Sequence, residues 1–211
     1  MSYNPVENYE AIRSRLEFLQ KKAKDPQDRS LLEQIAAGVE RLVEDATTNP
    51  VTKYRGLPRR DYDVKSIQER KRNYNKDFDF FVVMIDIDKF GDFNKKYGQH
   101  VGDQVLKATT EILEEGTREY DIIGKGYHLH GEELQVILQA PSKEIAALIV
   151  ERLRHDLEKK SKEKAGHKIT ATFGFTKWDV DKEDFEAAQQ RADARMQEGK
   201  QEQRNRIYYS A

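Results

Sequence analysis

The stretch that decides the fold is Phe81–Asp103, FVVMIDIDKFGDFNKKYGQHVGD, read together with His130–Leu134, HGEEL. The first stretch begins as an apolar run that ends at Asp86, which is typical of a strand covered on both faces. The second is a Gly-Glu-Glu turn between two apolar runs, which is typical of a hairpin tip. Adjacent carboxylates repel each other unless a cation lies between them, so this pattern favours a divalent metal and phosphate chemistry.

The composition excludes several classes of protein. The chain has 211 residues, with 37 Lys and Arg against 38 Asp and Glu, and no cysteine. The formal net charge of -1 gives no reason to expect DNA as a partner. Without cysteine there are no disulfides or thiolate metal sites, which fits a reducing compartment. No apolar run approaches the ~20 residues of a membrane span, so we expect a cytoplasmic protein that binds neither DNA nor a membrane.

Residues 1–48 carry two apolar stripes with helical spacing, and Asp25-Pro26 separates them. The pattern predicts a helical hairpin, whose stripes are buried against each other, the rest of the chain or a second subunit. The sequence leaves these alternatives open. We therefore divide the chain into a helical region at 1–48 and a second domain at 49–211. The stripes are Tyr9, Ile12, Leu16 and Leu19, then Leu32, Ile35, Val39, Leu42 and Ala46.

The second domain mixes strand and helix patterns. A loop is expected after the first strand. In the helix predicted at 143–160, the apolar spacing predicts a core-facing stripe of Ile145, Leu148, Ile149 and Leu153. Mixed strands with helices packed on one face predict an α+β sandwich. The predicted strands are 78–87, 122–123, 134–138, 169–175 and 206–209, and the predicted helices are 102–115, 143–160 and 181–198.

Acidic residues are the first candidates for a site. Asp86 ends a buried strand, where an acid is unusual unless it is paired or binds a metal, although an Asp that starts a turn explains it equally well. Glu132 and Glu133 alternate across the hairpin tip, so one of them should point at Asp86 if the two strands are neighbours. Taken alone, two acids in a turn are more often exposed to solvent. Asp88 is favoured as a structural residue that caps the loop.

Polar residues that could hold a nucleotide follow the first strand and end the last helix. Lys89-Phe90-Gly91-Asp92 is a strand-to-helix turn whose backbone N–H groups could bind phosphates. The amide of Asn94 and the carboxylate of Asp103 match the polar edge of guanine. Lys200 and Arg204 lie four apart, so they can share one helix face and bind a triphosphate. Each feature alone is more simply explained as a cap, a turn or a solvated helix end.

Taken together, these segments resemble the GGDEF family, the diguanylate cyclase domain, from about Asn49 to Tyr208. The family strand motif D-x-D-x-F-K-x-x-N-D-x-x-G-H-x-x-G-D is present as DIDKFGDFNKKYGQHVGD, and the signature G-G-[DE]-E-F is present as HGEEL. Three further family motifs match at 49–60, 169–175 and 192–205. Matches in the family's order are far more specific together than any one of them alone.

The resemblance implies a palm-like nucleotidyl cyclase fold, with a central mixed β-sheet flanked by helices, that binds GTP with Mg²⁺ or Mn²⁺. It implies metal binding by Asp86, Glu132 and the Ile87 carbonyl. Glu133 would bind the metal or assist deprotonation of the 3′-hydroxyl. Two domains, each holding one GTP, would meet in a homodimer to form cyclic di-GMP and release pyrophosphate. The implied substrate-binding residues are Phe90, Gly91, Asn94, Asp103, Lys200 and Arg204.

The chain departs from the family pattern near the signature. His130 replaces the first Gly, Leu134 the final Phe and Gly91 the Lys of the strand motif, and His128 replaces the Arg two residues before the signature. These departures leave two alternatives open. One is a degenerate GGDEF domain that binds a nucleotide and signals through the N-terminal helices, and the other is a divergent cyclase that makes another cyclic nucleotide.

An R-x-x-D motif at Arg118–Asp121 matches the family's inhibitory site, which would bind the product. Three extra residues before the signature shift this motif relative to it. Arg118 and Asp121 are therefore candidates for an inhibitory site, although so short a motif also arises by chance.

Overall fold

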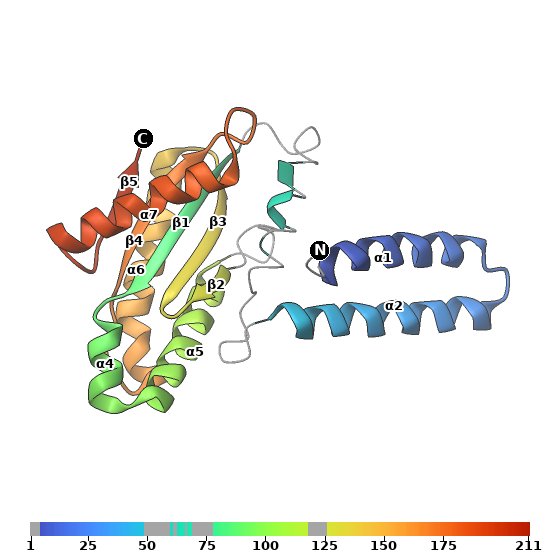
Figure 1. Ribbon diagram of the computed structural model, residues 1–211, viewed down its shortest axis with the longest axis horizontal. Coiled ribbons are helices and arrows are strands. Elements are labelled where there is room, and N and C mark those ends of the chain that lie inside the picture. Colours follow the sequence, from blue (N-terminus) through green and yellow to red (C-terminus); the bar gives the residue numbers. More distant parts are fainter. Residues whose placement is uncertain (1–4, 49–59, 61–62, 66, 69–77, 118–125) are drawn as a thin grey trace.

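The computed structural model describes residues 5–48, 60, 63–65, 67–68, 78–117 and 126–211. Helices α1 (Pro5–Lys22) and α2 (Pro26–Thr47) form the predicted helical hairpin (Figure 1). Asp25 caps α2, because its carboxylate accepts a hydrogen bond from the backbone N–H of Gln27 at 2.7 Å. Pro26 occupies the first turn, where its missing N–H costs no helical hydrogen bond.

The hairpin buries only part of its two apolar stripes. Tyr9 and Leu16 are buried, whereas Ile12 and Leu19 of the same predicted stripe are exposed. On α2 the side chain of Leu42 is 70% exposed. In Figure 1 the two helices lie side by side and extend away from the sheet. An apolar face of the hairpin is therefore left in contact with solvent.

A mixed sheet of five strands, in the order β2-β3-β1-β4-β5, forms the centre of the described residues from 78 to 211. β1 is the middle strand and pairs antiparallel with β3 and β4, while β4 and β5 are parallel. This central position explains why β1 is apolar on both faces, as its sequence predicted. The strands are β1 (Asp79–Ile87), β2 (Gly126–His130), β3 (Glu133–Ala140), β4 (Ala171–Trp178) and β5 (Ile207–Ser210). The α+β class is therefore as predicted, although the strand expected at 122–123 lies outside the described residues.

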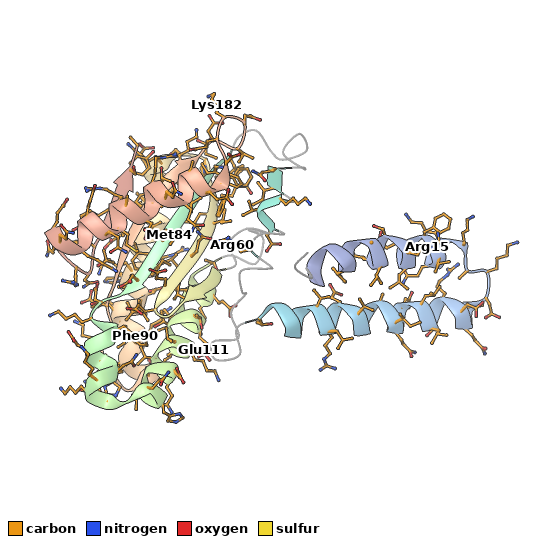
Figure 2. All side chains as sticks on the ribbon, viewed as in Figure 1. Arg15, Arg60, Met84, Phe90, Glu111 and Lys182 are labelled. Atoms are coloured by element: carbon orange, nitrogen blue, oxygen red, sulfur yellow. The ribbon has the colours of Figure 1, made fainter. Side chains whose placement is uncertain are left out.

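Helices cover both faces of the sheet, so the prediction that they pack on one face is wrong. Alternate residues of β1 enter two separate cores. Phe81 and Ile85 join residues of α5 and α6, whereas Phe80 and Met84 join residues of α7 (Figure 2 labels Met84). The sheet can bury two apolar faces because α7 returns across it after β4. The helices of this domain are α4 (Phe90–Tyr97), α5 (Gln99–Gly116), α6 (Lys143–Ala165) and α7 (Phe185–Glu202).

Two predicted helical features are wrong. The loop expected after the first strand contains α4, because Phe90 and Phe93 lie three apart and pack their rings against each other (Figure 2 labels Phe90). In α6, Ile145 and Leu148 are 40% and 67% exposed instead of facing the core. Leu153 is buried as predicted, and Ile149 is partly buried and packs against the core. The buried stripe is Ala146, Val150, Leu153 and Leu157, which has the same spacing rotated around the helix.

Gly174 on β4 lets α7 lie directly on the sheet. A β-carbon at residue 174 would stand 2.2 Å from the carbonyl oxygen of Ala192 and 2.5 Å from the backbone nitrogen of Met196. No side chain fits between two backbones at this separation, so the glycine is required by close approach. The close contact determines where the C-terminal end of α7, with Lys200, meets the strand ends.

Candidate active site

Asp86 lies at the centre of the candidate site, near the C-terminal end of β1. Its register partners are Glu133 on β3 and Thr172 on β4, so the signature strand is its direct neighbour, as predicted. Glu132 precedes β3, in the turn that joins it to β2. The Asp86 side chain is only 9% exposed. A carboxylate in this position needs a positive partner to remain ionised at low cost.

Lys200 supplies that positive charge from the last turn of α7. Its Nζ lies 2.6 Å from Oδ2 of Asp86, and the lysine side chain is 17% exposed. The distance corresponds to a short hydrogen-bonded ion pair. The predicted phosphate-binding lysine and the predicted metal-binding aspartate are therefore in direct contact, which the sequence did not predict.

Burial has the largest effect on the pKa of the Asp86 carboxyl. Burial raises the pKa of Asp86, the ion pair with Lys200 partly offsets this, and the negative charges of Glu132 and Glu133 raise it further. The two glutamates thus lie within electrostatic reach of Asp86. Even so, in the described part of the chain no three acidic or histidine side chains stand close enough together to hold a metal ion.

The donor atoms fit a hard divalent cation. Mg²⁺ and Mn²⁺ prefer carboxylate and carbonyl oxygens, and Asp86, Glu132 and Glu133 provide carboxylates around the end of one strand. A cation here would offset the charge whose burial raises the pKa of Asp86. The residues that could hold it are these three acids and the backbone carbonyl of Ile87.

Asp88 has a structural role, as predicted. Its two carboxylate oxygens accept hydrogen bonds from the hydroxyls of Thr170 and Thr172, each at 2.7 Å. Its backbone N–H also donates to the carbonyl of Thr170 at 2.9 Å. These bonds connect the end of β1 to the start of β4. Because both of its carboxylate oxygens already accept hydrogen bonds, Asp88 is a poorer candidate for a metal ligand than Asp86.

The turn after β1 differs from the predicted loop. Lys89 adopts a left-handed conformation with φ of 57° and precedes α4 directly. Phe90 is buried, whereas Gly91 is exposed and has open space around its α-carbon. Phe90 and Gly91 are therefore in the first turn of α4, where the N–H groups have no partner within the helix. Such groups can still bind phosphate oxygens.

Asn94 and Asp103 are brought together by the packing of α4 on α5. Oδ1 of Asn94 is buried and has no hydrogen-bond partner among the described residues. It lies against Gly102, where a β-carbon would be only 1.9 Å away. Asp103 is the next residue of α5 and is partly exposed. A buried amide oxygen without a partner is compatible with a polar ligand.

Arg204 does not share a helix face with Lys200, so that prediction is wrong. The helix α7 ends at Glu202, and Arg204 lies exposed in the turn that leads to β5. The next residue, Asn205, has φ of 59° and accepts a hydrogen bond from Arg154 at 2.6 Å. This contact anchors the turn next to Arg204, although no regular helical spacing relates Arg204 to Lys200.

Some of the predicted site residues lie outside the part of the chain that the structure describes. The inhibitory pair Arg118 and Asp121 lies outside the described residues, and the side chains of His128 and His130 are likewise not described. Sequence reasoning missed two contacts, the Lys200–Asp86 pair and the threonine hydroxyls on Asp88. The alternation of Thr170 and Thr172 on a strand was the only sequence signal for the second contact.

Comparison with known proteins identifies the family. Residues 53–206 match the family model described as diguanylate cyclase, GGDEF domain. The chain is 34% identical over 151 residues to diguanylate cyclase A of Treponema denticola, covering 71% of this chain and 38% of that protein. It is 31% identical over 156 residues to diguanylate cyclase DgcZ of Escherichia coli, covering 73% of this chain and 51% of that protein. The chain thus spans only about two fifths to half of the length of these curated relatives.

Solved structures share the fold. One is diguanylate cyclase SiaD of Pseudomonas aeruginosa, solved with its activator SiaC (TM-score 0.74, 22% identity, 97% of this chain and 75% of that chain). Another is the coiled coil and GGDEF domain of DgcB of Caulobacter crescentus, solved with c-di-GMP (TM-score 0.70, 20% identity, 87% of this chain and 96% of that chain). None of the described helices has both the length and the apolarity of a membrane span. The expectation of a diguanylate cyclase-like nucleotidyltransferase is thus supported at the level of the family, and the chain belongs to the GGDEF domain family.

Proposed function

We propose that this chain binds GTP and condenses two GTP molecules into cyclic di-GMP with release of pyrophosphate. The observation that carries the proposal is the position of Asp86. It is a nearly buried carboxylate at the end of the central strand, opposite Glu133, close to Glu132 and paired with Lys200. This group of charges suits a triphosphate accompanied by a divalent cation.

The acidic residues would hold Mg²⁺ or Mn²⁺ and take up a proton. Asp86, Glu132 and the Ile87 carbonyl are the proposed ligands, and Glu133 either joins them or accepts the proton of the 3′-hydroxyl. When bound, the cation would offset the negative charge that develops on the phosphates. The oxygen of the deprotonated 3′-hydroxyl forms a bond to the α-phosphorus as the bond to pyrophosphate breaks.

Cationic and polar groups would position the nucleotide. We assign phosphate binding to Lys200, Arg204 and the first turn of α4, which contains Phe90 and Gly91. The N–H groups of that turn and the two cations offer charge complementarity to phosphate oxygens. Guanine binding is assigned to the other polar pair, Asn94 and Asp103. The buried and unpaired oxygen of Asn94 supports this, because a guanine N–H group would provide its missing donor.

Joining two GTP molecules requires two sites that face each other, so we propose a homodimer. We assign residues 1–48 to a helical region that brings the copies together and residues 49–211 to the cyclase domain. Leu31, Ile35 and Leu42 on α2 support this assignment, because all three are exposed apolar side chains. Covering such a face with the same face of a second hairpin would bury it from water.

The test is to incubate the protein with GTP and Mg²⁺ and to detect pyrophosphate and a cyclic dinucleotide. We expect Asp86→Ala and Glu132→Ala to abolish product formation while the fold remains intact. Asp79→Ala is the matched control, because Asp79 lies on the same strand and also pairs with a lysine, Lys177, at 2.7 Å, but at the opposite end of β1. The proposal fails if neither the wild type nor a variant forced to dimerise forms any product.

A second function is a nucleotide-binding module without turnover. One observation favours it: among the described residues no three acidic or histidine side chains are close enough to hold a metal ion, and Asp86 is already paired with Lys200. Tight binding of GTP without product would support this function, and rapid turnover would exclude it. A panel of nucleotides tests the assignment of the base at the same time, since a preference for ATP would contradict the guanine roles of Asn94 and Asp103.

A further inference from the structure

Lys200 is paired with the Asp86 carboxylate, which a metal ion at this site would also need. Its Nζ lies 2.6 Å from Oδ2 of Asp86, and the two side chains are 17% and 9% exposed. A metal on the same carboxylate, with oxygen distances of about 2 Å, would stand close to the ammonium group. Two positive charges at that separation repel each other strongly where little water screens them. The ammonium group and the metal therefore compete for Asp86.

We propose that Lys200 is a resident cation that holds the place of the metal ion in the metal-free protein and leaves Asp86 when the metal binds. This inference rests on the proposed function, because it takes Asp86 as a metal ligand. The released ammonium group would then be free to bind the phosphates of GTP. One lysine would thus stabilise the empty site and act on the substrate in the loaded site.

The local structure allows Lys200 to move without moving its helix. The backbone of α7 is held by close contacts at residues that precede Lys200. Gly174 lies under Ala192 and Met196, and a β-carbon at Gly199 would be 2.2 Å from the ring of Tyr208. The lysine itself carries its charge on a flexible four-carbon chain. Release therefore needs only rotation of side-chain bonds, and the helix stays in place.

The burial of Asp86 explains why a place-holding cation is useful. The Asp86 side chain is only 9% exposed, and Glu132 and Glu133 bring two further negative charges to the same end of β1. Without Lys200, the metal-free site would hold three acids, and no other lysine or arginine of the described residues pairs with Asp86. Negative charge without a positive partner in so buried a position would lower the stability of the fold. An ion pair with a purely structural role would stabilise the Asp86 carboxylate equally well. The test must therefore detect competition between Lys200 and the metal ion.

The first experiment measures Mn²⁺ binding to the full chain without nucleotide, for the wild type, Lys200→Met and Lys177→Met. Lys177→Met is the matched control, because it also removes a lysine paired with an aspartate of β1, Asp79, at 2.7 Å. We expect Lys200→Met to bind Mn²⁺ about tenfold more tightly, within the usual range for coupled binding equilibria. The control is expected to bind like the wild type.

The outcomes separate this inference from the proposed function. If neither the wild type nor Lys200→Met binds Mn²⁺, the proposed metal site is wrong and the inference falls with it. If both bind Mn²⁺ with equal affinity, the metal site stands and only the place-holding role of Lys200 is overturned.

The second experiment uses only the wild-type protein, so it does not depend on the folding of a variant. Lysines are lightly acetylated with and without Mn²⁺, and the modification of each is quantified by mass spectrometry. Competition predicts that Lys200 becomes several-fold more reactive when Mn²⁺ is present, because its amine leaves Asp86, whereas Lys177 does not change. Unchanged reactivity of Lys200 at saturating Mn²⁺ would overturn the inference. It would also mean that any tighter binding by Lys200→Met reflects only the loss of a nearby charge.

Discussion

The side-chain oxygen of Asn94 lies against the backbone of Gly102, in the space that a β-carbon at residue 102 would occupy. The separation would be 1.9 Å, so the two groups cannot coexist. The carboxamide can take this position only because residue 102 has no side chain. The helices α4 and α5 therefore pack closely at Asn94, one of the two residues assigned to guanine.

Gly102→Ala is expected to weaken GTP binding by about tenfold, because the new methyl group displaces the amide that is assigned to the base. Stability should fall only slightly, since a flexible side chain can move aside. Titration of GTP against the folded variant checks this. Gly38→Ala is the control, because nothing lies within 4 Å of a β-carbon there. Equal GTP affinity in Gly102→Ala and the wild type would remove Asn94 from the site.

Gly174→Ala should destabilise the domain by about 2 kcal/mol or more, within the range for overpacked cores. The added methyl would collide with the backbone of α7 at Ala192 and Met196, which cannot rotate away as a side chain can. Urea-induced unfolding measures the change. In contrast, Gly38→Ala lies within a helix and should stabilise it by up to about 1 kcal/mol. A Gly174→Ala variant with wild-type stability would contradict the close packing described above.

Arg154→Met is expected to lower the free energy of unfolding by about 2–3 kcal/mol. The Arg154 side chain is only 7% exposed, and it donates hydrogen bonds to Glu151, Glu158 and Asn205. Its loss would remove a buried donor from all three acceptors, although Glu158 would keep its hydrogen bonds from Lys168 and Asn205, and it would loosen the turn before β5. Arg195→Met is the matched control, since its partners are largely exposed and such pairs contribute at most about 1 kcal/mol. Denaturant unfolding of both variants tests the contrast.

Glu158 should make stability depend on pH in the acid range. Hydrogen bonds from Lys168, Asn205 and Arg154 lower the pKa of Glu158 from 4.5 to about 2. Because the pKa is lower in the folded state, the stabilisation is complete above the unfolded value of 4.5 and is lost as the pH falls toward 2. With screening by solvent, we expect a contribution on the order of 1–2 kcal/mol.

Urea unfolding of the wild type and Glu158→Gln between pH 7 and pH 2.5 measures this contribution. The wild type should be the more stable protein at neutral pH, and the difference should shrink through the acid range. A difference that stays constant across this range would show that the charge of Glu158 does not stabilise the fold.

Local patterns were sufficient for much of the fold. Apolar residues on both faces of residues 81–85 predicted a central strand, and β1 is the central strand. The Asp25-Pro26 break predicted the hairpin. The helix predicted from residue 143 matches the start of α6, where the Ser142 hydroxyl accepts a hydrogen bond from the N–H of Ile145. The order of motifs indicated the family, and the register of Asp86 with Glu133 follows from adjacent strands. These features depend on neighbours in the chain or on a repeating pattern.

Other features depend on contacts between distant segments, and the sequence alone did not reveal them. The buried face of α6 was mispredicted because Leu148 and Val150 are equally apolar, and only the position of the sheet decides which one is covered. The contact of Lys200 with Asp86 exists because Gly174 brings α7 onto β4. The sequence by itself determined the strand that ends in an acid and the family to which it belongs. Only the tertiary structure decided that Lys200 pairs with this acid, because the pairing depends on how α7 packs against β4, two segments far from Asp86 in the chain.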